Sequence, residues 1–440
     1  MLTEMGRRAR AASKILALTS TVNKNKTLLT LADLLETSRG EVLTSNTIDV
    51  SAATSNGLSE AMIDRLTLNA KRLEGLASDL RHLAQLPDPV GERFDETVLP
   101  NGLRLRKQRV PIGVMGIIYE SRPNVTMDVA GLAIKTGNAA ILRGGSETIN
   151  SNRALINIIQ QALAANNLPA DVIQFIDSAD RGMVLELLKL HQYVDIIIPR
   201  GGAKLHQLCR ENSQIPVITG GMGICHLFVD ETADLAASLP LIYNSKVQRP
   251  SACNSLDTVL VHRSVAEKIL PQIVEQLAPA GVSFRAHESA IPYLLQQNTG
   301  AYLDPETQQV RFGADLGTHL PESVQPAGAD DFDIEWLNLT LGLKVVDGVS
   351  DAIAHIAAHS TAHSDGILTE DGANAALFIN EVDSAAVYVN ASTRFTDGAQ
   401  FGLGAEVAIS TQRLHARGPM GLRELTTYKW IAEGEYHIRE

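Results

Sequence analysis

The feature that most constrains the fold is a repeated alternation of short apolar runs and amphipathic segments between residues 110 and 198. The apolar runs have the length of buried strands, and the segments between them have the apolar spacing of helices. Strands that alternate with helices form a parallel sheet with helices on both faces, which binds ligands beyond the carboxyl ends of its strands. We therefore expect strands over 110–119, 139–142, 172–176 and 194–198, and helices over 127–136, 151–165 and 183–190.

A second alternation begins near Cys225 and predicts a second α/β domain. The residues before 87 have helical spacing, and 296–330 lose periodicity, so we expect a surface loop there. An Asn101-Gly102 turn within 98–109 predicts a hairpin, which is either an assembly element or an ordinary surface hairpin. In the second domain we expect strands over 226–229, 258–261 and 341–346, and helices over 233–243 and 265–277.

Composition excludes several classes of protein. A chain of 440 residues with 45% hydrophobic and 20% charged residues is typical of a multidomain globular protein. The net charge of −12 argues against nucleic acid or an anionic membrane as the main partner. Three cysteines do not make a disulfide framework, and no apolar run reaches the roughly 20 residues needed to cross a bilayer. We expect a cytoplasmic protein.

Cys253 is the candidate nucleophile. It stands among small and polar residues after Lys246, Arg249 and Pro250, in a pattern typical of a loop entering a site. A thiolate beside positive charge is nucleophilic, although an arbitrary cysteine more often fills a core, as we expect of Cys209 and Cys225.

Three histidines at four-residue spacing, His355, His359 and His363, raise the question of a metal site. Ser360, Ser364 and Gly366 favour a helix that ends before the third histidine, and no carboxylate or cysteine completes a ligand set. We expect no metal.

Several stretches together carry a family resemblance that covers nearly the whole chain. These stretches are 114–126, 135–147, 196–204, 216–226, 248–254, 388–406 and 414–422. With them the chain resembles the aldehyde dehydrogenase superfamily and, within it, the gamma-glutamyl phosphate reductase family. The resemblance implies an aldehyde dehydrogenase-like α/β fold with a Rossmann-type cofactor domain, a second α/β catalytic domain and a small oligomerisation element.

The resemblance implies that Cys253 accepts the acyl group and that Asn124 helps to stabilise the tetrahedral oxyanion. From the residues alone, a helix cap before Met127 is the favoured explanation of Asn124. Oxidising relatives carry a water-activating glutamate just before a Gly-Gly pair, and here Ile218 and Thr219 precede that pair. The absence of a base at this position fits an enzyme that exchanges the acyl group with phosphate better than one that hydrolyses the thioester.

The resemblance also implies NADP(H) as the cofactor. Arg143 and Ser146 are expected to hold a 2′-phosphate, whereas Glu147 is a candidate for ribose hydroxyls and Arg143 is alternatively an ordinary strand-end arginine. Glycines after a strand and before a helix let phosphate approach the backbone. The further candidate cofactor residues are Arg200, Gly201, Gly202, Gly220, Gly221 and, near the nicotinamide-side ribose, Glu335.

The implied substrate is L-glutamyl 5-phosphate, reduced in proline biosynthesis to glutamate 5-semialdehyde, with glutamate kinase as the partner that supplies it and a homo-oligomer as the assembly. Another acylating aldehyde dehydrogenase, acting on an acyl-CoA or a different acyl phosphate, or a catalytically silent protein with the same fold, remains the alternative. The candidate substrate residues are Arg122, Arg249, Ser392, Thr393 and Arg394, although the arginines are alternatively structural ion-pair partners.

The predicted domains follow from these assignments. Residues 1–97 and 110–224, with part of 375–410, are expected to bind NADP, and 225–374 are expected to form the catalytic domain. The hairpin 98–109 and the tail 411–440 are expected to mediate oligomerisation.

Overall fold

The computed structural model describes residues 1–220, 222–297, 301–303, 310–312 and 318–439. The chain divides into two compact units, a first unit of Met1–Gly221 with Gly398–Glu440 and a second unit of Met222–Asp397. The second unit therefore extends past the predicted end at residue 374. The reason is that strands β16 (Ser364–Leu368) and β17 (Ala386–Val389), which are separated in sequence by helix α14 (Gly372–Glu381), lie side by side in the sheet of the second unit.

The first unit is built on a four-stranded parallel sheet in the order β5-β4-β3-β6. Its strands are β3 (Val114–Tyr119), β4 (Ala139–Arg143), β5 (Ile173–Phe175) and β6 (Ile196–Arg200). Its helices are α1 (Leu2–Leu16), α2 (Thr21–Thr37), α3 (Arg39–Ser55), α4 (Glu60–Leu66), α5 (Ala70–Gln85), α6 (Asn124–Thr136), α7 (Ile149–Ala165), α8 (Gly182–Leu187) and α9 (Ala203–Asn212).

Alternate residues of β3 pack on opposite faces of this sheet. Met115 and Ile117 lie in the apolar cluster that includes α2, α5, α6 and α7. Val114 and Ile118 lie in a separate cluster with α1, α8 and α9. The continuous apolar run of β3 thus follows from burial on both faces, which confirms the predicted parallel sheet.

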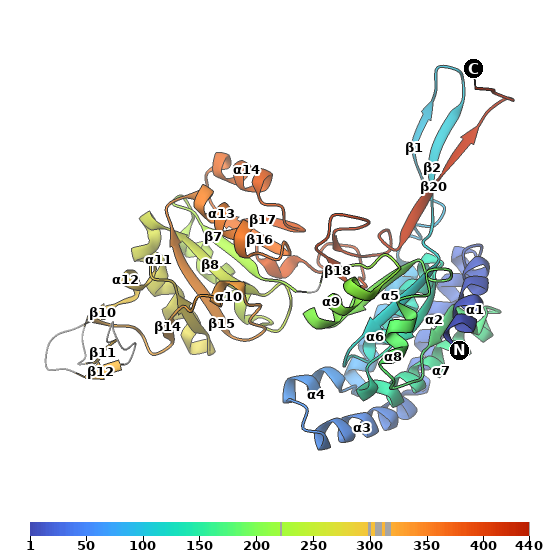
Figure 1. Ribbon diagram of the computed structural model, residues 1–440, viewed down its shortest axis with the longest axis horizontal. Coiled ribbons are helices and arrows are strands. Elements are labelled where there is room, and N and C mark those ends of the chain that lie inside the picture. Colours follow the sequence, from blue (N-terminus) through green and yellow to red (C-terminus); the bar gives the residue numbers. More distant parts are fainter. Residues whose placement is uncertain (221, 298–300, 304–309, 313–317, 440) are drawn as a thin grey trace. The chain divides into compact units, whose positions relative to one another are not determined.

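The predicted hairpin is present and is longer than expected. Strands β1 (Arg93–Val98) and β2 (Arg104–Pro111) pair antiparallel, and β20 (Thr426–Glu433) adds a third strand to β2 (Figure 1). Val110 and Pro111 pair with β20, so the predicted strand 110–119 is in fact the end of β2 followed by β3. The chain bends between them at Gly113, whose φ of +132° favours glycine. A further short pair joins β18 (Ile409–Ser410) and β19 (Gly418–Pro419).

The second unit contains a seven-stranded parallel sheet in the order β14-β9-β15-β8-β7-β16-β17 (Figure 1). Its strands are β7 (Cys225–Val229), β8 (Leu256–His262), β9 (Ser283–Ala286), β14 (Val324–Pro326), β15 (Thr340–Val346), β16 (Ser364–Leu368) and β17 (Ala386–Val389). Its helices are α10 (Leu235–Val247), α11 (Arg263–Leu277), α12 (Ile291–Leu294), α13 (Val349–His359) and α14 (Gly372–Glu381).

Three strands of the second sheet were not predicted. Strands β9 and β16 were not expected, and β14 lies in the predicted surface loop 296–330 but pairs with β9 at the sheet edge. Much of that loop lies outside the described residues; its described part also holds the short strands β10 (Gln296–Gln297), β11 (Ala301–Leu303), β12 (Val310–Phe312) and β13 (Thr318–His319). In the part of the chain that the structure covers, no helix has the length and apolar character of a membrane span.

Candidate active site

Cys253 lies in the loop that joins α10 to β8, at the amino ends of the parallel strands of the second unit. It is partly exposed, whereas Cys209 and Cys225 are fully buried. This confirms the prediction that Cys253 sits in a loop and that the other two cysteines fill cores. Burial raises the pKa of Cys209 to about 12 and also raises that of Cys225, so both favour the protonated thiol.

The loop after Cys253 is held by Asn254, which the sequence reasoning missed. The Asn254 side chain is buried, and its Nδ2 donates to the backbone oxygens of Arg394 (3.2 Å) and Thr396 (2.8 Å). In return, Thr393 Oγ1 donates to the backbone oxygen of Asn254 at 2.7 Å. These three bonds attach the nucleophile loop to the segment 393–396. The only sequence signal was the position of Asn254 directly after the cysteine.

Ser392 and Thr393 serve the chain itself. Ser392 Oγ donates to Asn244 Oδ1 at 2.8 Å and lies 2.9 Å from Ser245 Oγ. A hydroxyl has one hydrogen to donate, and Thr393 gives its own to Asn254. In this structure both hydroxyls hold segments of the chain together, and their predicted contact with the substrate stays a prediction.

Arg249 and Arg394 place positive charge beside the thiol. Burial lowers the pKa of Arg394, the nearby Arg249 lowers it further, and Cys253 acts in the opposite direction. Arg394 Nε donates to Gln248 Oε1 at 2.9 Å, which attaches this arginine to the nucleophile loop. Of the predicted substrate residues, these two therefore lie together near Cys253.

Glu335 belongs to the second unit and contacts the segment before β7. Its Oε1 accepts a hydrogen bond from the backbone N–H of Gly223 at 2.9 Å. The predicted contact with a cofactor ribose remains a prediction, and the observed partner is the backbone of the second unit itself.

Three predicted site residues of the first unit lie where β3, β4 and β6 end. Arg143 and Arg200, predicted to bind the cofactor, end β4 and β6 at the carboxyl edge of the sheet, and Arg122, predicted to bind the substrate, follows β3 there. Parallel sheets commonly bind ligands at this edge, and both roles stay predictions. Glu147 does not have a free carboxylate, because its Oε1 accepts from the Ser121 backbone N–H (2.8 Å) and from Ser121 Oγ (2.7 Å). It therefore ties two loops of this edge together, whereas Ser146 is exposed.

Arg143 is the cofactor candidate with an unused donor. Its side chain is buried, and its Nη1 donates to the backbone oxygen of Gly144 at 2.6 Å. Its Nε is buried and has no hydrogen-bond partner among the described residues. Burial lowers the pKa of Arg143. A buried cationic donor without a partner fits a site for an anionic group.

The two glycines before α9 lie against the carboxylate of Glu120. The backbone N–H of Gly202 donates to Glu120 Oε2 at 3.0 Å, and the predicted contact of these glycines with a cofactor phosphate stays a prediction. A side chain at Gly201 would collide with the same carboxylate, since its Cβ would lie 2.3 Å from Glu120 Oε2. Arg200 ends β6 beside them.

Close packing explains why residue 220, the first of the Gly-Gly pair, is a glycine. A Cβ on Gly220 would lie 2.1 Å from the backbone oxygen of Ile409, so close backbone packing requires glycine there. Gly221 lies outside the described residues. Ile218, which stands where oxidising relatives carry a glutamate, is 2% exposed and belongs to the apolar core of the first unit.

Asn124 is the first residue of α6 and does not cap it. The N-cap is Pro123, and Asn124 Nδ2 donates one turn further along to Asp128 Oδ2 at 3.0 Å. The capping alternative is therefore wrong. Burial raises the pKa of Asp128 to about 6, and the bond from Asn124 acts against this shift. Arg122, two residues before Asn124, is partly buried.

As predicted, the three histidines do not share one helix. Helix α13 ends at His359, and the rings of His355 and His359 lie 4.3 Å apart, while His363 follows in the next loop. Lys344 Nζ lies 3.1 Å from His355 Nδ1. Within the described ranges, no group of three or more potential metal ligands is present.

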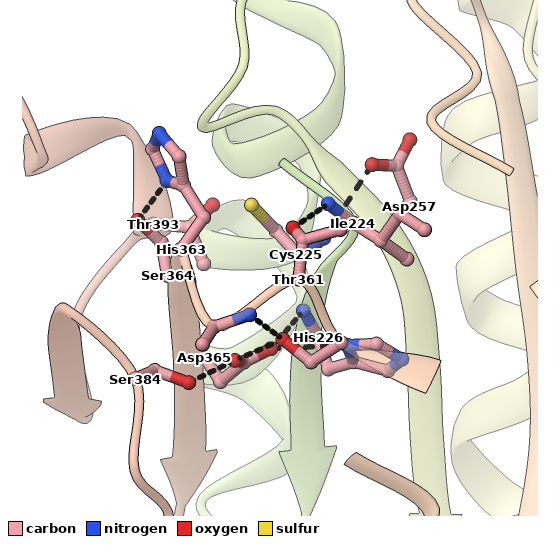
Figure 2. Close-up of polar contacts among 12 residues, drawn as sticks. Ile224, Cys225, His226, Asp257, Thr361, His363, Ser364, Asp365, Ser384 and Thr393 are labelled. Carbon is pink, nitrogen blue, oxygen red and sulfur yellow. Dashed lines mark hydrogen bonds and ion pairs between the residues drawn. The ribbon is translucent and has the colours of Figure 1, made fainter. Parts of the chain in front are cut away.

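His363 is a buried neutral group beside the nucleophile loop. Its Nδ1 lies 2.8 Å from Ser364 Oγ (Figure 2). The chain of hydroxyls continues from Ser364 to Thr396 (2.6 Å) and from Thr396 to Tyr388 (2.6 Å). Burial lowers the pKa of His363 to about 4, so the imidazole is uncharged at neutral pH.

Comparison with known proteins shows the family to which the chain belongs. The model of the aldehyde dehydrogenase family matches residues 2–289. Gamma-glutamyl phosphate reductases from Tolumonas auensis and Roseiflexus castenholzii are each 54% identical, over 100% of this chain and 99% of the relative. The crystal structure of gamma-glutamyl phosphate reductase from Thermotoga maritima superposes with a TM-score of 0.91 at 46% identity, over 99% of both chains.

The buried His363 predicts that the stability of the protein falls in mild acid. Its pKa is lower in the folded state than the ordinary value near 6.5, so the unfolded chain binds more protons between pH 6.5 and 4. We expect the free energy of unfolding to decrease through this range by at most about 1.4 kcal/mol per pH unit from this group. Urea denaturation of the His363→Gln variant should show a shallower pH dependence than wild type, whereas exposed His191→Gln should not; equal slopes would contradict the prediction.

Proposed function

We propose that this chain, which belongs to the aldehyde dehydrogenase family, reduces L-glutamyl 5-phosphate to glutamate 5-semialdehyde and phosphate in proline biosynthesis. The observation that carries this proposal is the full-length match, at 54% identity, to gamma-glutamyl phosphate reductases. The partly exposed Cys253 beside two arginines supplies the chemistry that such a reaction needs.

The proposed reaction proceeds through Cys253. The Cys253 thiolate attacks the acyl carbon, the carbon–oxygen bond to phosphate breaks, and phosphate leaves with the bonding electrons. The acyl group is then a thioester on Cys253. When bound, a nicotinamide cofactor supplies the hydride that reduces this thioester. The resulting thiohemiacetal on Cys253 collapses, the aldehyde leaves, and the thiol is regenerated after it takes up a proton. Asn124 remains the predicted donor to the oxyanion.

The two arginines near the thiol support an acyl phosphate as the substrate. A phosphate group carries charge on several oxygens, and guanidinium groups bind such oxygens with charge-assisted hydrogen bonds. We assign phosphate binding to Arg394 and the local field around the thiol to Arg249; Arg122 remains a predicted contact for substrate anions.

The chain uses a nicotinamide cofactor, and we propose that it is NADP(H). The buried Arg143, with its unpartnered Nε, is the residue best suited to hold the 2′-phosphate. Ser146, exposed in the next turn, is available to add a hydroxyl. The glycines before α9 support phosphate binding only if Glu120 moves away from the Gly202 amide.

We further propose that the three-stranded sheet of β1, β2 and β20 mediates self-association. It exposes Val98, Tyr428 and Trp430, which is unusual for large apolar residues on a surface strand.

The enzyme that supplies the acyl phosphate, glutamate kinase, remains a predicted partner.

Replacing the nucleophile is the direct test of the proposed function. We expect Cys253→Ala to lower phosphate-dependent NADPH formation from glutamate semialdehyde by more than about 10³-fold, because no other described thiol is accessible. Cys209→Ala is the matched control and should keep its activity, since Cys209 lies in the core of the first unit. An active Cys253→Ala enzyme would exclude the covalent route, and stronger turnover with coenzyme A than with phosphate would favour the acyl-CoA alternative.

The assignment of phosphate to Arg394 predicts a specific kinetic change. We expect Arg394→Gln to raise the KM for phosphate about 10- to 100-fold in the oxidative direction, since one charge-assisted contact is lost. Arg263→Gln is the control, because Arg263 follows the opposite end of β8 and pairs with Asp347 on the surface. The two variants should be compared by initial rates at varied phosphate concentration. An unchanged phosphate KM in Arg394→Gln would remove this arginine from the phosphate site.

The NADP(H) assignment predicts that Arg143 discriminates between the two cofactors. In Arg143→Leu we expect kcat/KM for NADPH to fall at least about tenfold more than kcat/KM for NADH, because only NADPH carries the 2′-phosphate. Arg153→Leu, which changes an exposed arginine paired with Asp177, serves as the control. An equal loss of kcat/KM with both cofactors would show that Arg143 contacts a part of the cofactor that NADPH and NADH share.

A further inference from the structure

We propose that Gly223 and Cys225 are positioning residues that fix the peptide of Cys253, with the Cys225 thiol serving as a hydrogen-bond donor. The inference rests on the proposed role of Cys253 as the acyl acceptor. It concerns a second thiol next to the first, which the reaction itself does not use.

Gly223 is required for space. A Cβ at this position would lie 1.6 Å from the backbone oxygen of Cys253 and 2.7 Å from its carbonyl carbon. The same Cβ would lie 3.2 Å from Cγ of His363. Gly223 is not among the glycines with a left-handed backbone, so conformation does not explain its identity. The glycine instead allows the chain before β7 to lie directly against the Cys253 carbonyl.

Cys225 contacts the same carbonyl from the first position of β7. Its Sγ lies 3.3 Å from the backbone oxygen of Cys253, within the distance of a thiol hydrogen bond. The side chain is fully buried in the sheet, and burial raises its pKa, so the sulfur keeps the hydrogen that it donates. Cys225 therefore holds the nucleophile loop and does not compete with Cys253 for the acyl group.

The segment 222–225 is itself held in place. Glu335 accepts from the Gly223 N–H at 2.9 Å. Thr361 Oγ1 accepts from the Ile224 N–H at 2.9 Å and donates to the Met222 backbone oxygen at 2.8 Å. Figure 2 shows Thr361, Ile224 and Cys225 together at this edge of the sheet. A segment bonded on both sides offers a fixed support for the Cys253 peptide.

The position of this carbonyl bears directly on catalysis. It belongs to Cys253, the residue that carries the attacking sulfur of the proposed reaction. Rotation of the peptide after Cys253 would move the loop relative to the bound acyl group. Displacements of about 1 Å at a reacting centre cost on the order of 100-fold in rate. The clamp on the carbonyl therefore restricts the direction in which the thiolate attacks.

The test compares four variants of the full-length protein with wild type. Cys225→Ala removes the donor, Cys225→Ser restores a donor of similar size, and Gly223→Ala introduces the collision. Gly372→Ala is the matched glycine control, since a Cβ there has nothing within 4 Å. For each protein we would measure kcat, the KM for phosphate and the rate of Cys253 alkylation by iodoacetamide, located by peptide mass spectrometry. Urea denaturation would report whether each variant is folded.

We expect Cys225→Ala to lower kcat about tenfold with the phosphate KM within about twofold, and to change the alkylation rate of Cys253. Cys225→Ser should recover most of both values, because a hydroxyl can donate to the same carbonyl. Gly223→Ala should lower kcat on the order of 100-fold, and Gly372→Ala should behave as wild type. Recovery by serine would not follow from a purely structural role.

Two results would overturn the proposal. One is a folded Cys225→Ala protein with wild-type kcat and wild-type alkylation of Cys253. The other is a Cys225→Ser protein that is as impaired as Cys225→Ala. Failure of the proposed function would look different: Cys253→Ala would stay active, while the alkylation rates would still report whether Gly223 and Cys225 hold the Cys253 loop.

Discussion

The parallel register between β7 and β8 is the constraint on which the candidate site depends. It places Cys225 beside Leu256, three residues after Cys253, so the start of one strand lies against the loop that precedes the other. Strand β16 pairs with β7 in parallel, so His363, the residue just before β16, lies near the amino end of β7. A shift of β7 by two residues would keep the same apolar faces buried but would move Gly223 away from the Cys253 carbonyl. Packing at the loop thus helps to select the register.

The fold was largely predictable because both sheets are parallel and buried on both faces. Such strands are continuous apolar runs, and β3, β4 and β7 stand out in the sequence for that reason. Strands β9 and β14 did not, since they have only four and three residues and so carry little periodicity. The extension of the second unit to Asp397 was missed because sheet membership is a long-range property, which local patterns do not contain.

The reacting thiol of the candidate site was predictable from the sequence, but the residues that hold its loop in place were not. Cys253 stood out because its neighbours are polar and positively charged. Ser392, Thr393 and Glu147 were assigned to ligands, yet in the structure they satisfy backbone or side-chain partners of their own chain. A hydroxyl or carboxylate serves either purpose, and the sequence does not reveal which backbone groups the fold leaves unpaired. Asn254 and Cys225 were overlooked for the same reason.

The three thiols differ in environment more than in chemistry. All begin from the same intrinsic acidity, but Cys209 and Cys225 lie where burial penalises the thiolate. Cys253 stands beside Arg249 and Arg394, in a loop that reaches the surface. Since the thiolate is the reactive form, burial and neighbouring charge determine which sulfur is suited to the proposed reaction. Burial raises the pKa of Cys225, and its thiol thus keeps the hydrogen that, in our proposal, it donates to the backbone oxygen of Cys253.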